Sequence, residues 1–149
     1  MENTYNNKKT LTKRIIVAKA VAFIFAVIYI ATFVTQTNHD LVSKLSLGTL
    51  LVCMTMGLVI ALAGVFAKHP FLGFQMKWYL RGAFLGTLII FMFVLLSYDA
   101  FKTVIDSPLI SWMGIESPYW AVIDGTIMGL IIDFVATKMA GEGRELEIS

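Results

Sequence analysis

The sequence predicts an all-α polytopic integral membrane protein, a compact bundle of four transmembrane helices with a short interfacial helix in the second external loop. Three observations predict this fold. First, four apolar stretches each reach the roughly 20 residues that a helix needs to cross a bilayer core of about 30 Å. Second, hydrophobic residues make up 58% of the 149-residue chain and charged residues only 15%. Third, nearly all the basic residues lie on one side of the four stretches.

The basic residues predict the orientation of the chain. Ten of the twelve lysines and arginines flank the same ends of the stretches, and only Lys44 and Lys102 flank the opposite ends. Because cytoplasmic loops collect Lys and Arg, we expect both termini to be cytoplasmic, and an even number of spans agrees with this. The expected location is the cytoplasmic (plasma) membrane, with the lipid bilayer as the first partner.

The elements follow in order along the chain. Residues 1–14 are expected to form a basic cytoplasmic arm, residues 15–140 a single transmembrane domain, and residues 141–149 a cytoplasmic tail. Pro70 cannot continue a helix, so the second span must end before it. The four spans are predicted at about residues 15–34, 45–67, 78–98 and 119–139.

The second external connection, residues 99–117, is the longest and is amphipathic. Phe101, Val104 and Ile105 share one face of a helix drawn through this segment. Lys102 and Asp106 lie off that face. Ser107 followed by Pro108 predicts a second helix start. Three aromatic residues suit headgroup depth, namely Trp112, Tyr119 and Trp120. We therefore expect one or two short helices on the outer membrane surface.

Small residues recur at steps of three or four in every span, which places them on one face of each helix. In lipid, such faces let helix backbones approach closely. The residues expected to pack are Ala22 and Ala26, Gly57 and Ala61, Gly82 and Gly86, and Gly125 and Gly129. The alternative is that small residues are simply common in membrane helices. Four helices with such faces favour a tightly packed bundle and argue against a wide pore within one subunit.

Three ionisable residues fall within the predicted spans, Lys19, Asp124 and Asp133, and Arg81 lies at the cytoplasmic margin. An Asp at the centre of a span costs about 2.5–3.5 kcal/mol on insertion scales, so it needs a partner. Asp133 and Lys19 lie on the small faces of their spans at similar depth. We expect a Lys19–Asp133 ion pair, with Arg81 as the competing partner. This pair either fixes the register between helices or takes part in a proton or ion relay.

Asp124 is expected to form a separate polar site on the external side. It lies nine residues from Asp133, and at about 100° per residue the two carboxylates project to opposite sides of the helix. They therefore cannot form one acid/base pair on one face. The polar residues at similar depth are Gln36, Ser43, Ser97 and Tyr98. Asp124 would line a water-filled vestibule, bind a partner subunit or extend toward the headgroups.

Recognisable catalytic and cofactor motifs are absent, including the phosphate-binding loop and the common hydrolase signatures. His39 and His69 lie on opposite sides of the predicted membrane, so they cannot share a metal or a haem within one subunit. Cys53 has methionines nearby, but adjacent helix positions point in different directions and methionine commonly fills cores. We expect no metal, no cofactor and no nucleic-acid partner.

Two functions compete on this evidence. The favoured one is a non-enzymatic helix-bundle subunit or accessory component of a membrane complex or a homo-oligomer, whose partners are other membrane subunits or further copies of itself. The alternative is a small proton- or ion-coupled transporter or channel that uses Asp133 with Lys19, and Asp124. A membrane-bound enzyme acting at the interface is a third and weaker reading, because no catalytic constellation is visible.

Overall fold

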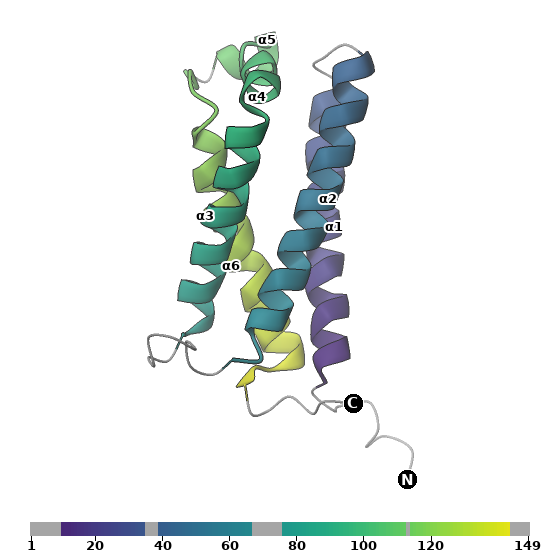
Figure 1. Cartoon of the computed structure of the whole chain (residues 1–149), viewed down its shortest axis with the longest axis vertical. Helices are drawn as coiled ribbons and strands as arrows, with labels where there is room; N and C mark the ends of the chain where they lie inside the picture. The colour runs from purple at the N-terminus through teal and green to yellow at the C-terminus, as the bar shows by residue number, and fades with distance from the viewer. Residues whose placement is uncertain (1–9, 35–38, 67–75, 113, 144–149) are drawn as a thin grey trace.

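A computed structural model describes residues 10–34, 39–66, 76–112 and 114–143. Four long helices lie side by side in an elongated bundle (Figure 1): α1 (Leu11–Val34), α2 (His39–Ala63), α3 (Trp78–Leu96) and α6 (Trp120–Ala140). Two short helices connect α3 to α6 at one end of the bundle, α4 (Tyr98–Ile105) and α5 (Pro108–Ser111). The predicted all-helical fold is therefore confirmed.

All four long helices are long and apolar enough to cross a membrane, as judged by length and composition. The qualifying stretches are Leu11–Thr32, Lys44–Ala63, Trp78–Leu96 and Trp120–Ala140. Each overlaps one of the four predicted stretches, so their number and approximate positions are confirmed.

Several helix ends differ from the predicted bounds, and the largest difference is at α2, which begins at His39, six residues before the predicted start at residue 45. Helix α1 begins at Leu11, one turn before the predicted start at residue 15, and the Lys13 backbone N–H donates to Thr10 Oγ1 at 3.2 Å as an N-cap would. Arg14 therefore belongs to the helix and not to the arm. Helix α2 ends at Ala63, where Val65 turns back to donate to the Leu62 carbonyl at 3.1 Å.

Helices α3 and α6 pack with their backbones in contact. Gly82 and Gly86 on α3 face Gly125 and Gly129 on α6. A Cβ added at Gly82 would lie 2.6 Å from the Gly129 carbonyl oxygen, and one added at Gly86 would overlap the Gly125 carbonyl oxygen. Only glycine allows this approach, which brings the two helices into van der Waals contact along two turns.

Helices α1 and α2 form the second close pair. A Cβ added at Gly57 of α2 would lie 2.9 Å from both the Ala18 carbonyl oxygen and the Ala22 Cβ of α1. Ala26 and Ala61 are also fully buried. Helix α6 contacts α1 and α2 as well as α3, so it joins the two pairs into one core.

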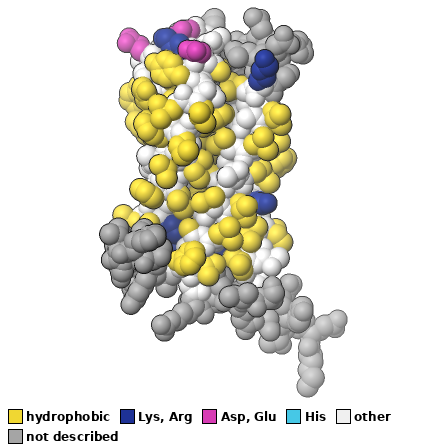
Figure 2. Space-filling view, viewed as in Figure 1, with side chains coloured by type: hydrophobic (Ala, Val, Ile, Leu, Met, Phe, Trp, Pro, Cys, Tyr) yellow, Lys and Arg dark blue, Asp and Glu magenta, His cyan; other side chains and the backbone are white. Residues whose placement is uncertain are grey.

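The outward faces of the long helices carry large apolar side chains. Figure 2 shows one side of the bundle, where hydrophobic side chains cover the length of the helices and acidic side chains gather at the end that carries α4 and α5. Exposed side chains occur on every long helix, as Ile24, Leu51, Phe84 and Ile127 illustrate, each at 50–59% exposure. This surface differs from that of an ordinary globular protein, where such side chains are scattered singly.

Helix α4 is amphipathic, as predicted. Val104 and Ile105 are buried, whereas the side chains of Lys102 and Asp106 are 44% and 58% exposed. Lys102 Nζ donates to Asp106 Oδ1 at 2.9 Å, and this hydrogen bond raises the pKa of Lys102. Phe101 packs edge to face on Phe93 of α3, with ring centroids 5.3 Å apart, which holds α4 against the end of the bundle.

Candidate functional site

Four charged side chains from three helices and the segment after α6 form a buried cluster at the end of the bundle opposite α4 and α5. We call Arg14, Arg81, Asp133 and Glu142 the charge cluster. Asp133 is fully buried and Arg81 is 2% exposed. Arg81 donates two hydrogen bonds to Asp133, from Nε to Oδ2 at 2.7 Å and from Nη2 to Oδ1 at 2.8 Å. Such paired geometry is the strongest form of the Arg–carboxylate interaction.

Arg14 reaches the same carboxylate from α1. Its Nη2 donates to Asp133 Oδ1 at 2.5 Å, and its Nε donates to the Ala61 carbonyl oxygen at 3.1 Å. Its Nη1 donates to Thr137 Oγ1 and to the Gly141 carbonyl oxygen. The fully buried guanidinium therefore touches α2, α6 and the segment after α6. Among the described residues, Arg14 is the one side chain of α1 whose hydrogen bonds reach α2, α6 and the segment after α6 together.

Two glycines make room for the Arg14 side chain. A Cβ at Gly64, just after α2, would overlap the guanidinium itself. Gly141 ends α6 at a φ of 80°, a left-handed conformation that favours glycine, and so turns its carbonyl toward Arg14. The chain then continues past α2, where the Gly143 N–H donates to the Gly64 carbonyl at 2.8 Å.

Glu142 completes the charge balance. Arg81 Nη2 donates to Glu142 Oε2 at 2.9 Å, and the Glu142 side chain is 37% exposed. Two guanidinium groups thus face two carboxylates, which is the arrangement that buried charges require. Because guanidinium donors already bind both oxygens of Asp133, this carboxylate offers little room for a substrate or a transported ion.

The predicted Lys19–Asp133 pair is corrected by this geometry. Arg14 and Arg81 hold Asp133. Within the described residues no ion pair joins Asp133 to Lys19, whose side chain is half-buried on α1. Arg14 stands four residues before Ala18 and so continues the buried row of Ala18, Ala22 and Ala26. Lys19 lies about 100° around the helix from Ala18, off that row.

Arg14 was predicted to lie in the basic arm, so its place in the charge cluster was not expected. The signal was present in the spacing of four that runs from Arg14 through the alanines of α1. A large charged residue that continues a row of small buried residues must itself be buried, and so must have a partner.

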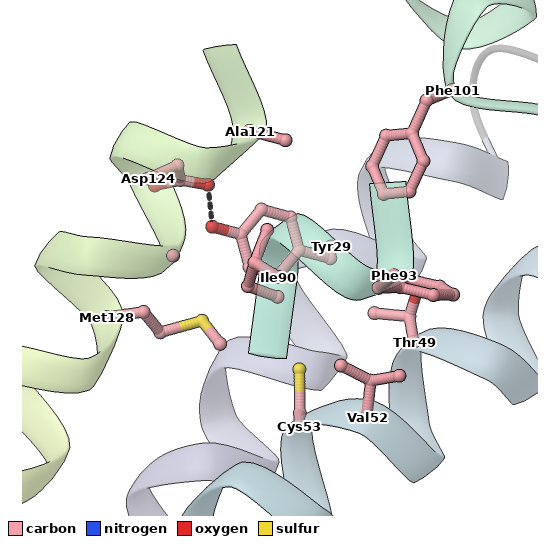
Figure 3. Close-up of a pocket in the computed structure, with 11 residues that line it drawn as sticks. Tyr29, Thr49, Val52, Cys53, Ile90, Phe93, Phe101, Ala121, Asp124 and Met128 are labelled. Atoms are coloured by element: carbon pink, nitrogen blue, oxygen red, sulfur yellow. Dashed lines mark hydrogen bonds between the residues drawn. The ribbon is translucent and has the colours of Figure 1, made fainter. Parts of the chain in front are cut away.

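A second polar group lies in the other half of the bundle. Asp124 on α6 accepts a hydrogen bond from the Tyr29 hydroxyl of α1 (Figure 3). The carboxylate is exposed on the side of the helix, within a stretch of apolar residues. Tyr29 was not among the predicted partners of Asp124, because a tyrosine within an apolar span resembles an ordinary core residue.

A small cavity lies beside the Tyr29–Asp124 contact. Its volume is about 40 Å³, and side chains from α1, α2, α3, α4 and α6 line it. Most of the lining is apolar. Its polar members include Thr49 of α2, whose side chain is 5% exposed and whose Oγ1 has no hydrogen-bond partner. We call this space the Asp124 cavity.

The described residues hold no group of three or more His, Cys, Asp and Glu side chains arranged to bind a metal. His69 lies outside the described residues, and Cys53 is buried beside the Asp124 cavity. The charge cluster and the Asp124 cavity remain the candidate sites. The chain matches no protein-family model, no curated protein and no solved structure.

Proposed function

We propose that this chain is an integral protein of the cytoplasmic membrane that serves as a non-enzymatic helix-bundle component of a membrane complex or a homo-oligomer. The observation that carries this proposal is the charge cluster. Its charges are matched within the bundle, and they connect the four long helices at one end. Charges arranged in this way hold helices in register and leave the outer faces free to contact lipid or other helices.

The outer surface supports insertion into a bilayer. Large apolar side chains are exposed on all four long helices, as a lipid-facing surface requires. Ten of the twelve lysines and arginines flank the ends of the helices on one side, which supports cytoplasmic termini. The charge cluster then lies toward the cytoplasm, and α4 with α5 lies on the outer side as the interfacial element. Trp112, Tyr119 and Trp120 are each at least 45% exposed and would sit at headgroup depth.

Labelling of single cysteines tests the topology. Cys53 is the only native cysteine, so Cys53→Ala gives a clean background. Thr37→Cys and Glu116→Cys should react with a membrane-impermeant maleimide in intact cells. Asn3→Cys, Gln75→Cys and Ser149→Cys should react only after the membrane is opened. Labelling of the last three in intact cells would contradict the proposed orientation.

Assembly tests the function itself. The tagged full-length chain, extracted from its native membrane into lipid nanodiscs, should carry a partner or further copies at a fixed stoichiometry by native mass spectrometry. Asp133→Asn should disturb that stoichiometry, whereas Asp106→Asn, a matched change at an exposed carboxylate, should leave it intact. A monomer that carries no partner in native lipid would contradict the proposal.

A transporter is the second candidate, and one observation favours a particular form of it. Asp133 is occupied by two arginines, whereas Asp124 is exposed and borders a cavity. The carboxylate that would couple transport is therefore Asp124. In liposomes with an imposed pH gradient and membrane potential, flux that Asp124→Asn abolishes would favour the transporter. Flux that only Asp133→Asn abolishes, from a variant that remains folded, would instead favour a relay through the charge cluster.

A further inference from the structure

The Asp124 cavity has features of a binding site that the bundle's architecture alone does not explain. It lies where the long helices meet α4, away from the charge cluster. Figure 3 shows the Tyr29 hydroxyl pointing at Asp124, with Thr49 and Cys53 on the opposite wall. A cavity that served only as a packing defect would have an apolar lining throughout, because buried polar groups without partners are costly.

Two polar groups that line this cavity could each gain a partner from a bound ligand. Thr49 Oγ1 is buried without a hydrogen-bond partner. Asp124 accepts from Tyr29, but within the part of the chain that the structure describes no lysine, arginine or histidine forms an ion pair with it. A carboxylate within an apolar helix is costly unless a positive charge meets it. A ligand that carries one positive charge and donates hydrogen bonds would satisfy both groups.

The rest of the lining selects the kind of cation. Ca²⁺ and similar hard ions need six or more oxygen ligands, and the few oxygens here are too sparse for that. The walls are instead the side chains of Phe93 and Phe101 with Ile90 and Met128. Aromatic and aliphatic walls around a single carboxylate suit an ammonium group that carries an alkyl chain.

We propose that the Asp124 cavity binds a short primary alkylammonium ion. The ammonium group would donate to the Asp124 carboxylate and to Thr49 Oγ1, while the alkyl chain packs against Ile90 and Met128. The volume of about 40 Å³ restricts the ligand to a few non-hydrogen atoms. This inference goes beyond the proposed function, since it holds whether the bundle is a subunit or a carrier.

Met128 provides a direct probe of occupancy, because its side chain lines the cavity and is 1% exposed. The full-length protein in nanodiscs would be labelled with ¹³C at the methionine methyl groups and titrated with ethylammonium chloride at constant ionic strength. The Met128 methyl signal should shift and saturate in the millimolar range, as expected for so small a ligand. Met139, which is 56% exposed near the far end of α6, should not move.

Variants and control ligands make the proposal falsifiable. Asp124→Asn should weaken binding about tenfold or more, because it removes a charge-assisted hydrogen bond. Thr49→Val, which nearly preserves the side-chain volume and leaves the Asp124 carboxylate in place, should weaken ethylammonium binding severalfold. Asp106→Asn should leave that binding unchanged. Any one of four results would overturn the proposal: no Met128 shift with ethylammonium, an equal shift with ethanol, an equal shift with sodium chloride, or unchanged affinity in both Asp124→Asn and Thr49→Val.

Discussion

The two halves of the bundle accommodate a carboxylate of α6 in opposite ways. In one half, Asp133 is fully buried and held by two guanidinium groups, and the backbone of the surrounding helices supplies further acceptors. In the other half, Asp124 is exposed and accepts from one tyrosine beside a cavity. The same residue type on the same helix is therefore part of the framework in one place and available for interaction in the other.

This difference follows from the side chains that surround each carboxylate. At the charge cluster, small residues let α1, α2 and α6 approach until one arginine spans them, and Gly64 leaves the space for its guanidinium. Near Asp124, the larger side chains of Tyr29, Phe93 and Phe101 line the space between the helices, and a cavity remains. The partners and exposure of the carboxylate, and not its residue type, thus separate Asp133 from Asp124.

The largest expected effect comes from neutralising Asp133. Asp133→Asn leaves two buried guanidinium groups facing one half-exposed carboxylate, and breaking a buried ion pair in this way costs about 3–5 kcal/mol. Unfolding of the variant by denaturant, followed by circular dichroism in mixed micelles, measures the change. A loss of less than about 1 kcal/mol, the range of exposed ion pairs, would show that the cluster does not hold the helices together.

Arg14 and Lys19 provide the next test, because they distinguish the observed partner of Asp133 from the predicted one. Arg14→Gln should destabilise the bundle by about 3 kcal/mol or more, since it removes one side of a buried pair and the contact with the Ala61 carbonyl. Lys19→Gln should change the free energy of unfolding by less than about 0.5 kcal/mol, because Lys19 takes no part in the charge cluster. The same denaturant titration measures both, and the reverse ranking would restore the Lys19 pair.

The comparison also separates what the sequence could predict from what it could not. Helix number and approximate positions follow from the length of the apolar stretches, and the amphipathic α4 follows from hydrophobic periodicity, both of them local properties of the chain. The partner of Asp133 depends on a start at Leu11 instead of residue 15, a shift of one turn that moves Arg14 from the arm into the helix. The Asp124 cavity depends on five helices at once, and no local pattern encodes how side chains from distant segments fill a shared space.

A smaller effect is expected at the contact between α3 and α6. Gly86→Ala places a methyl group against the Gly125 carbonyl, so the helices must separate, at a cost of about 1–3 kcal/mol. Gly48→Ala is the matched control, because its new Cβ would meet only the edge of the Phe93 ring at 3.3 Å. Thermal unfolding in nanodiscs compares the two. Equal melting temperatures would mean that the glycine contact is not tight in the bilayer.

The smallest effect is expected at Tyr29 and Asp124, which is what makes that half available for a ligand. Tyr29→Phe and Asp124→Asn each remove one hydrogen bond at a partly exposed site, so each should cost about 1 kcal/mol. A double-mutant cycle isolates the coupling, expected at about 0.5–1.5 kcal/mol. If the coupling instead approached the 3–5 kcal/mol expected at Asp133, both carboxylates would be parts of the framework. Weak coupling at Asp124 beside strong coupling at Asp133 would mean that α6 carries two carboxylates of different kinds. Asp133 would hold the helices together, and Asp124 would remain accessible to a ligand.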